Sequence, residues 1–157
     1  MRVMVFVKAT PASEKGLPPP PGTMEAMGTF NAELHNAGIL LMAAGLKPTA
    51  HAKRVAFDGP ARTVTNGPFA ETRELVAGLW LWQVKDMEEA VAWAKRCPNP
   101  MPGPSEIEIR PLFEMADIEA LLPPEVLALG NDRVQRWEAL HATSAAATDT
   151  DKLDVDL

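Results

Sequence analysis

Four residues between positions 66 and 72 carry side chains that could bind or transform a small molecule. Asn66 begins this run, Phe69 offers an aromatic surface, and Glu71 and Thr72 add a carboxylate and a hydroxyl. A large ring beside polar groups is typical of a pocket wall, so Asn66, Phe69 and Thr72 are candidate ligand-binding residues. Glu71 is the candidate general base, although a solvated carboxylate or a cap is the simpler explanation.

Two further candidates stand elsewhere in the chain. His35 lies near the end of a predicted helix; its imidazole suits general base catalysis, and interaction with the helix dipole would also account for it. Arg110 lies on the last predicted strand and could clamp a ligand carboxylate, with a salt bridge to an acid on a neighbouring strand as the alternative. The other histidines and Cys97 show no metal-ligand spacing, and no phosphate-loop, dinucleotide or nucleophile-elbow motif is present. We therefore expect no metal and no cofactor.

Hydrophobic periodicity predicts the elements that must position these residues. Gly-Pro pairs mark sharp turns between the middle strands, and a proline-rich stretch over 9–22 predicts a stiff loop. The order of elements predicts an α+β fold, a ferredoxin-like split βαβ arrangement with helices on one face of a mainly antiparallel sheet. The expected strands are 2–8, 39–45, 52–57, 61–65, 75–84 and 107–112, and the expected helices are 23–37, capped by Thr23, and 86–95, capped by Asp86.

Methionine and aromatic side chains predict a pocket between the sheet and the first helix. Met24, Met27, Phe30 and Leu34 fall at helical spacing and would face the sheet, where core packing is the alternative role. The expected lining is Met27, Phe30, Met42, Phe69 and Trp80.

The longest predicted strand, 75–84, carries apolar residues on both faces, with Trp80 and Trp82 together on one of them. A sheet with helices on one side only would leave the second face bare. A second copy of the chain would cover it, which predicts a homodimer.

Composition limits the classes of function. The 157 residues are 46% apolar and 23% charged, the balance of a soluble globular protein. A formal net charge of -6 without a basic stripe argues against nucleic-acid and anionic-lipid partners. No apolar run approaches the ~18 residues of a membrane span, and the single cysteine and the short apolar N-terminus indicate a cytoplasmic protein.

The chain divides into three predicted parts. Residues 1–115 form the αβ domain, 116–142 supply apolar residues around Pro123-Pro124 and form a helical extension, and 143–157 are small and acidic, which predicts a disordered tail.

Three blocks of sequence, in order, resemble the YCII-related proteins and in particular their DGPF branch. These blocks are Ala37-Gly38-Ile-Leu-Leu leading to Gly45-Leu-Lys-Pro48, Asn66-Gly67-Pro68-Phe69-Ala70-Glu71-Thr72, and Glu108-Ile-Arg110-Pro111. The resemblance covers roughly residues 1–115. It implies a ferredoxin-like, dimeric αβ-barrel fold.

Function in that family is mostly unassigned. One relative dehydrochlorinates a chlorinated hydroxyquinol, and plain YCII members are thought to use a histidine with an aspartate, at positions that here hold Met27 and Cys97. The signature begins with Asn66 where the branch has Asp, and an amide cannot take up a proton at neutral pH. The resemblance implies a small-molecule-binding dimer, lyase-like or isomerase-like, acting on a phenolic or carboxylic metabolite. The alternative is a non-catalytic interaction module that modulates an extracytoplasmic-function sigma factor.

Overall fold

The computed structural model describes residues 1–70, 74–114, 116–117 and 123. Met1–Leu112 forms one compact unit, to which the account of the fold refers. Most of 116–142 and all of 143–157 lie outside the described residues, so the predicted extension, the tail and the domain boundaries remain predictions. The elements are β1 Arg2–Lys8, α1 Pro11–Glu14, α2 Thr23–Asn36, β2 Leu40–Gly45, the 3-10 helix η1 Thr49–His51, β3 Lys53–Asp58, β4 Ala61–Asn66, β5 Val76–Gln83, α3 Met87–Arg96 and β6 Ile107–Pro111.

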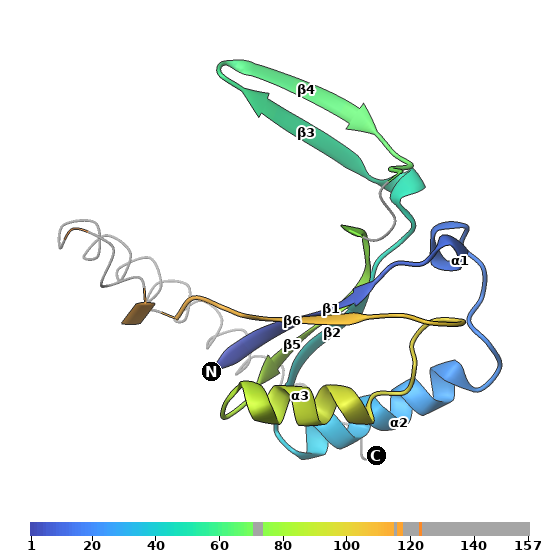
Figure 1. Ribbon diagram of the computed structural model, residues 1–157, viewed down its shortest axis with the longest axis vertical. Helices are drawn as coiled ribbons and strands as arrows, with labels where there is room; N and C mark the ends of the chain where they lie inside the picture. The colour runs from blue at the N-terminus through green and yellow to red at the C-terminus, as the bar shows by residue number, and fades with distance from the viewer. Residues whose placement is uncertain (71–73, 115, 118–122, 124–157) are drawn as a thin grey trace, which may run out of the picture. The chain divides into compact units, whose positions relative to one another are not determined.

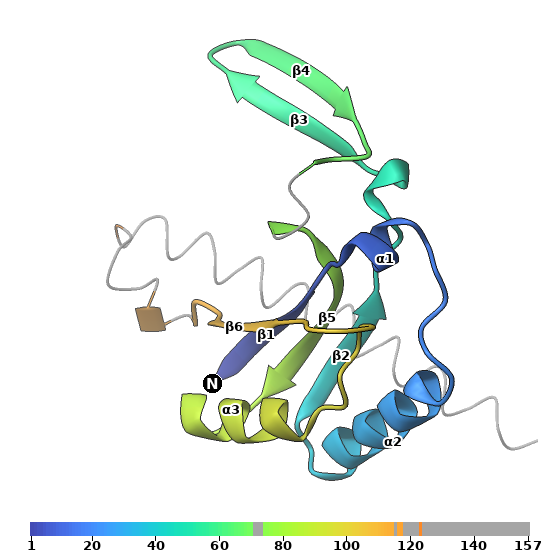
Figure 2. The same ribbon diagram turned by 45° about the vertical axis from the view of Figure 1, so that its right-hand side comes forward.

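Four strands form an antiparallel sheet in the order β2-β5-β1-β6, with α2 and α3 on one side of it (Figures 1 and 2). Each helix joins one pair of strands, α2 between β1 and β2 and α3 between β5 and β6. The α+β class is confirmed, and this strand order is compatible with the ferredoxin-like prediction.

The core lies between the sheet and the two helices. Val3, Val5 and Val7 alternate with more exposed neighbours along β1, so one face of that strand is buried. Trp82, on β5, has no exposed surface, and its ring lies 5.9 Å from that of Trp80. Both tryptophans therefore face the helices.

The other side of the sheet carries a partly exposed apolar surface that we call the open face. Its central side chains are those that alternate with the buried residues of β1 and β5, where Phe6 pairs with Leu79 and Met4 with Leu81. The open face is defined by Met4, Phe6, Leu79 and Leu81.

The cap of helix α2 lies one residue earlier than predicted. The N-cap is Gly22, with φ of 80°, and Thr23 is already helical. Glycine reaches this left-handed conformation without the strain that a Cβ would bring. At the other end, Gly38 has φ of 72° and stops the helix, as predicted. No helix in the described part of the chain has the length and apolar character needed to cross a membrane.

The proline-rich segment is not wholly a loop, which corrects the prediction for 9–22. Helix α1 forms one turn there because Thr10 and Ser13 cap each other: the Ser13 amide donates to the Thr10 hydroxyl, and the Thr10 amide donates to the Ser13 hydroxyl. Pro11 occupies the first helical position, where the missing amide hydrogen costs nothing.

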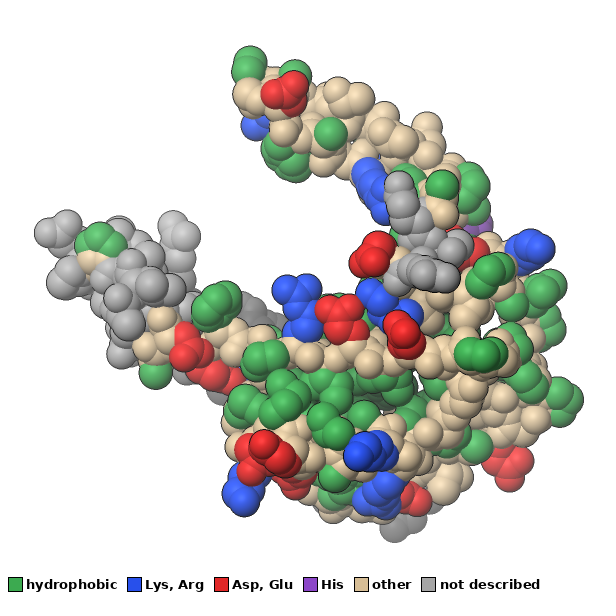
Figure 3. All heavy atoms as spheres, viewed as in Figure 1, with side chains coloured by type: hydrophobic (Ala, Val, Ile, Leu, Met, Phe, Trp, Pro, Cys, Tyr) green, Lys and Arg blue, Asp and Glu red, His purple; other side chains and the backbone are tan. Residues whose placement is uncertain are grey.

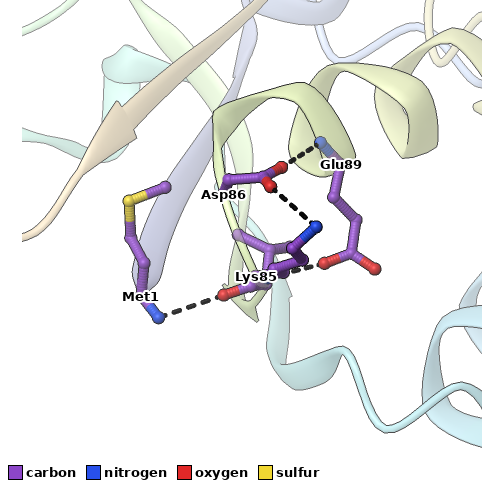
Figure 4. A network of polar contacts seen from close by, with 5 residues as sticks. Met1, Lys85, Asp86 and Glu89 are labelled. Atoms are coloured by element: carbon purple, nitrogen blue, oxygen red, sulfur yellow. Dashed lines mark hydrogen bonds and ion pairs between the residues drawn. The ribbon is translucent and has the colours of Figure 1, made fainter.

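Helix α3 begins at the predicted cap, shown in Figure 4. The Glu89 amide donates to the Asp86 carboxylate over 2.9 Å, and the Lys85 amide donates to the Glu89 carboxylate over 2.6 Å. The amide hydrogen bond from Glu89 stabilises the ionised form of Asp86 and lowers its pKa. The N-terminal amine of Met1 donates to the Val84 carbonyl over 3.0 Å, which fixes the start of β1 beside the cap.

Strands β3 and β4 pair only with each other and form a hairpin that we call the arm, residues 53–66. Both strands lie close to their predicted positions, on either side of the turn at Gly59-Pro60. Every residue of the two strands is exposed. The sheet lies between the arm and the two long helices (Figures 1 and 2).

Candidate ligand-binding site

A cavity of about 640 Å³ opens between α2 and the end of the sheet where β2 ends and β5 begins. Small residues create this space, because Ala43, Gly45, Ala77 and Gly78 carry little or no side chain on the strands. An added Cβ at Gly78 would lie 3.1 Å from the Ala44 carbonyl oxygen, which is a tight contact. The volume falls within the range of roughly 300–1,000 Å³ that small-molecule sites occupy.

The walls of the cavity are apolar. Met24, Met27 and Leu17 line it from the helix and the loop before it, and Trp80 lines it from the sheet. Methionine is flexible and polarizable, so these side chains can adapt to ligands of different shapes.

One polar pair lies on this surface. The indole nitrogen of Trp80 donates to the side-chain oxygen of Asn31 over 2.9 Å. This bond fixes the indole plane and leaves the amide nitrogen of Asn31 available as a donor. Ser13 and Thr23 add hydroxyl groups, and every described side chain in the lining is uncharged at neutral pH.

Two proline-rich loops form the rim. Pro18 and Pro19 stand on one side, and the segment from Pro100 to Pro102 stands on the other. Asn99 braces the second loop: its side-chain oxygen accepts from the Met101 amide over 3.1 Å, and its side-chain nitrogen donates to a carbonyl oxygen four residues further on. These hydrogen bonds brace the second loop from within.

Two of the five predicted lining residues, Met27 and Trp80, lie on the cavity wall. Phe30 is buried behind the wall and packs edge-on against Trp80, with ring centroids 6.3 Å apart. It supports the site and does not line it. Met42 pairs with Leu81 beside the open face and is 44% exposed.

Arg110 and His35 lie away from the cavity. Arg110 is on β6, its side chain is 69% exposed, and its Nε lies 3.9 Å from a carboxylate oxygen of Glu108. This ion pair lies within β6, whereas the alternative predicted a salt bridge to a neighbouring strand. His35 is exposed in the last turn of α2 and does not line the cavity. Within the described residues, no group of three or more His, Cys, Asp or Glu is placed to hold a metal ion.

The signature turn after the arm has a structural role in the described residues. An added Cβ at Gly67 would lie 1.7 Å from the Thr49 carbonyl oxygen, so only glycine fits this close approach. The Phe69 amide donates to the Thr49 hydroxyl over 3.1 Å, and that hydroxyl donates in turn to Glu14. The arrangement joins the turn to η1 and α1.

The side chains of this turn also have partners. The guanidinium of Arg54 lies 3.9 Å above the Phe69 ring, and Lys53 donates to the Asn66 side chain over 2.7 Å. Neither Asn66 nor Phe69 lines the cavity. Glu71 and Thr72, the other two candidates of this turn, lie outside the described residues.

Sequence reasoning missed Asn31 and the two rim loops. Asn31 was detectable, because Met24, Met27 and Asn31 lie at i, i+3 and i+7 and so share one helical face. The loop residues Leu17 and Met101 carry no such periodic signal. Only the fold brings them together.

Comparisons with known proteins give a family but no activity. Residues 1–116 match the model of the YCII-related domain. An uncharacterized protein of Rhizobium meliloti is 36% identical over 76 residues, which are 48% of this chain. The match spans 61% of that relative's length.

Proposed function

The chain belongs to the family of YCII-related domain proteins, and from that premise we propose that it binds a small, neutral, largely apolar molecule in the cavity between α2 and the sheet. The observation that carries the proposal is the chemistry of the lining, which combines methionine, leucine, proline and tryptophan with the neutral polar groups of Asn31, Ser13 and Thr23. Apolar walls with a few oriented polar groups are the usual composition of a small-molecule site.

The lining also predicts which ligands the cavity rejects. A carboxylate that enters a largely apolar cavity loses its hydration and gains no cationic partner from the described wall. A phenol or an alcohol keeps a hydrogen bond to the free donor of Asn31. Of the two metabolite classes suggested by the resemblance, the phenolic one fits better.

Lyase-like or isomerase-like chemistry requires an acid, a base or a nucleophile near the ligand. The described lining offers only neutral amide and hydroxyl groups for this purpose. Binding is therefore the core of the proposal. Glu71 remains the candidate base for the enzymatic alternative, and the interaction-module alternative concerns 116–142, mostly outside the described residues.

We further propose that two copies pack through their open faces, as the family's dimeric barrel would require. The supporting observation is the partly exposed apolar set Met4, Phe6, Leu79 and Leu81 on the side of the sheet away from α2 and α3. Phe6→Glu places a charge at its centre and is expected to shift a concentration series in analytical ultracentrifugation to the monomer. A wild-type chain that stays monomeric throughout would contradict this assembly.

A fluorescence titration tests the binding site. The probe is N-phenyl-1-naphthylamine, a neutral aromatic amine whose emission rises in apolar surroundings. The double substitution Leu17→Asn with Met24→Gln places polar groups on two exposed side chains of the cavity wall. We expect at least a tenfold rise in Kd, about 1.4 kcal/mol of lost apolar contact.

The matched control changes the same residue types on β2. Leu41→Asn with Met42→Gln alters two exposed side chains that do not line the cavity. Its Kd is expected to stay within about twofold of wild type. If both double substitutions weakened probe binding equally, the site would lie elsewhere.

A second titration compares 2-naphthol with 2-naphthoate at pH 7. Tighter binding of the carboxylate would contradict the neutral-ligand proposal.

A further inference from the structure

The arm carries an exposed apolar stripe on one of its two faces. Val55 and Val64 are directly opposed across the hairpin, and Phe57 is opposed to Arg62. The exposed fractions are 47% for Val55, 56% for Val64 and 74% for Phe57. The guanidinium of Arg62 lies 4.5 Å from the Phe57 ring and covers it only in part.

This stripe is unexpected for a hairpin that stands alone. An isolated two-stranded ribbon is marginally stable in water, because it has no third layer against which to bury side chains. Each residue of β3 and β4 is exposed, so the arm finds no such layer within its own unit. The stripe therefore indicates a surface that another molecule covers.

The position of the arm indicates where that molecule lies. The sheet separates the arm from α2 and α3 (Figures 1 and 2), so arm and open face are on the same side of the sheet. A body that covers the open face would also lie beside the arm. The two apolar surfaces thus point to one occupant.

The size of the open face favours contact with the arm. Four strands of up to eight residues give a face of about 20 Å by 25 Å, or about 500 Å² in projection. Stable assemblies bury about 800 Å² of accessible surface on each partner, so any area that the arm adds favours a stable contact. One face of the arm, with two strands of six residues, adds about 200 Å².

Charge favours a second copy of this chain as the occupant. The arm carries Lys53, Arg54 and Arg62 against Asp58, a formal charge of +2.

The sheet carries a complementary cluster at the end of β1 and the start of β6. There Lys8 interacts with Glu74, Glu106 and Glu108, and Arg110 lies 3.9 Å from Glu108, so the cluster has a formal charge of -1. Figure 3 shows these charge types along β6, on the side away from α3. Each copy thus presents both a basic arm and an acidic edge, which is the self-complementarity that a two-fold dimer requires.

We propose that the arm of each protomer closes over a second copy bound at the open face, with the Val55, Phe57 and Val64 stripe packed against the partner. The proposal rests on the two-copy assembly proposed above. It adds that the dimer is held by exchanged arms as well as by the sheets.

A substitution series in the full chain tests this role. Val55→Thr, Phe57→Thr and Val64→Thr together remove the apolar stripe and place threonine, a β-branched residue that suits a strand, at all three positions. We expect the dimer dissociation constant, measured by sedimentation, to rise at least tenfold while tryptophan fluorescence of the core is unchanged. The control, Ala56→Ser, Ala61→Ser and Thr63→Ser, changes the opposite face and should leave the constant within twofold.

Three outcomes are decisive. A wild-type dimer with an unchanged constant in the stripe variant would overturn the arm proposal and leave the sheet-to-sheet dimer standing. Equal weakening by the stripe variant and the control would overturn the assignment to the apolar face. A monomeric wild-type chain would overturn both proposals.

Photo-cross-linking gives an independent readout. p-Benzoylphenylalanine replaces Phe57 in one sample and Ala56 in the matched control. Efficient intermolecular cross-linking from position 57 but not from 56 is expected. If position 57 cross-linked only within its own chain, to residues 113–157, the proposal would be overturned. The arm would then contact its own chain and not a partner.

Discussion

The helix-covered face of β1 and the apolar face of the arm have similar local sequences and opposite burial. Val3 and Val5 alternate with other residues and have no exposed surface. Val55 and Phe57 also alternate along a strand and are mostly open to solvent. Both patterns predict a half-buried strand, yet in the described unit only one of them is packed. Alternation thus indicates which side chains share a face and does not indicate what covers that face.

The difference lies in what the connecting segments provide. β1 and β5 are joined to helices whose apolar residues, including Phe30 and Leu34, pack over them. Figure 3 shows apolar side chains between β6 and α3. β3 and β4 are joined to each other by a short turn at Gly59-Pro60, so no helix is available to cover them. The arm depends on a partner for a contact that the sheet obtains from its own chain.

The largest expected effect contrasts the two regions directly. Trp82→Ala removes a ring with no exposed surface and is expected to lower the free energy of unfolding by about 3–5 kcal/mol. Phe57→Ala removes an exposed ring from the arm and should cost no more than about 0.5 kcal/mol at a protein concentration where sedimentation shows monomers. Urea unfolding measures both values.

If Trp82→Ala does not fold, Trp82→Phe replaces it in the comparison. Trp82→Phe should still lower the free energy of unfolding by more than Phe57→Ala does. Similar losses at the two positions would mean that the arm is packed within its own chain, and the contrast between the regions would fail.

A smaller effect is expected at the junction between the arm and the sheet unit. Gly67→Ala forces a Cβ against the Thr49 carbonyl and should cost about 1–3 kcal/mol in thermal unfolding. Gly28→Ala is the control, because nothing lies within 4 Å of its added Cβ inside α2. Alanine is the better helix former, so the control should gain about 0.5–1 kcal/mol. If Gly67→Ala and Gly28→Ala changed the stability in the same direction, this role of Gly67 would be contradicted.

The smallest effect concerns the acidic edge that the arm is proposed to meet. The Lys8 ammonium donates to Glu108 over 2.9 Å, and this bond lowers the pKa of Glu108 and raises the pKa of Lys8. A carboxylate with a lowered folded-state pKa stabilises the fold above its unfolded-state pKa of about 4.3, and the stabilisation disappears as the pH falls through the folded value. Glu108→Gln should therefore be slightly less stable than wild type at pH 7.

That difference should vanish in acid. Thermal unfolding between pH 7 and pH 2 measures it, with Asp58→Asn on the exposed arm as the control. A difference between wild type and Glu108→Gln that stays constant down to pH 2 would mean that the ion pair contributes nothing. Both substitutions remove one carboxylate, so overall charge effects cancel.

Much of the fold was predictable from local patterns. The α+β class, six strands and the two long helices follow from apolar spacing, from the Asp86 cap and from glycine stops such as Gly38. The predictions for the loop at 9–22 and for the start of the first long helix were wrong, because local capping decided the backbone there. Thr10 and Ser13 cap a helical turn within the proline-rich stretch, and Gly22 takes the capping position expected for Thr23.

The candidate site was predictable only in part. Helical spacing places Met27 toward the sheet, and Trp80 follows from strand alternation, so both lining residues were found. Met42 was misplaced on the cavity wall because the register shifts between Leu40 and Met42, which turns Met42 to the other side of the sheet. A shift of this kind reverses the face of every later side chain and leaves no local mark in the sequence.

By itself, the sequence determined the strands and the long helices, because each depends on backbone preference and side-chain period over a few residues. Only the tertiary structure decided that Leu17, Asn31 and Met101 share one cavity and that the arm has no cover within its own unit. These facts depend on how distant segments meet, and the free energy of such contacts is shared among residues that no local pattern connects.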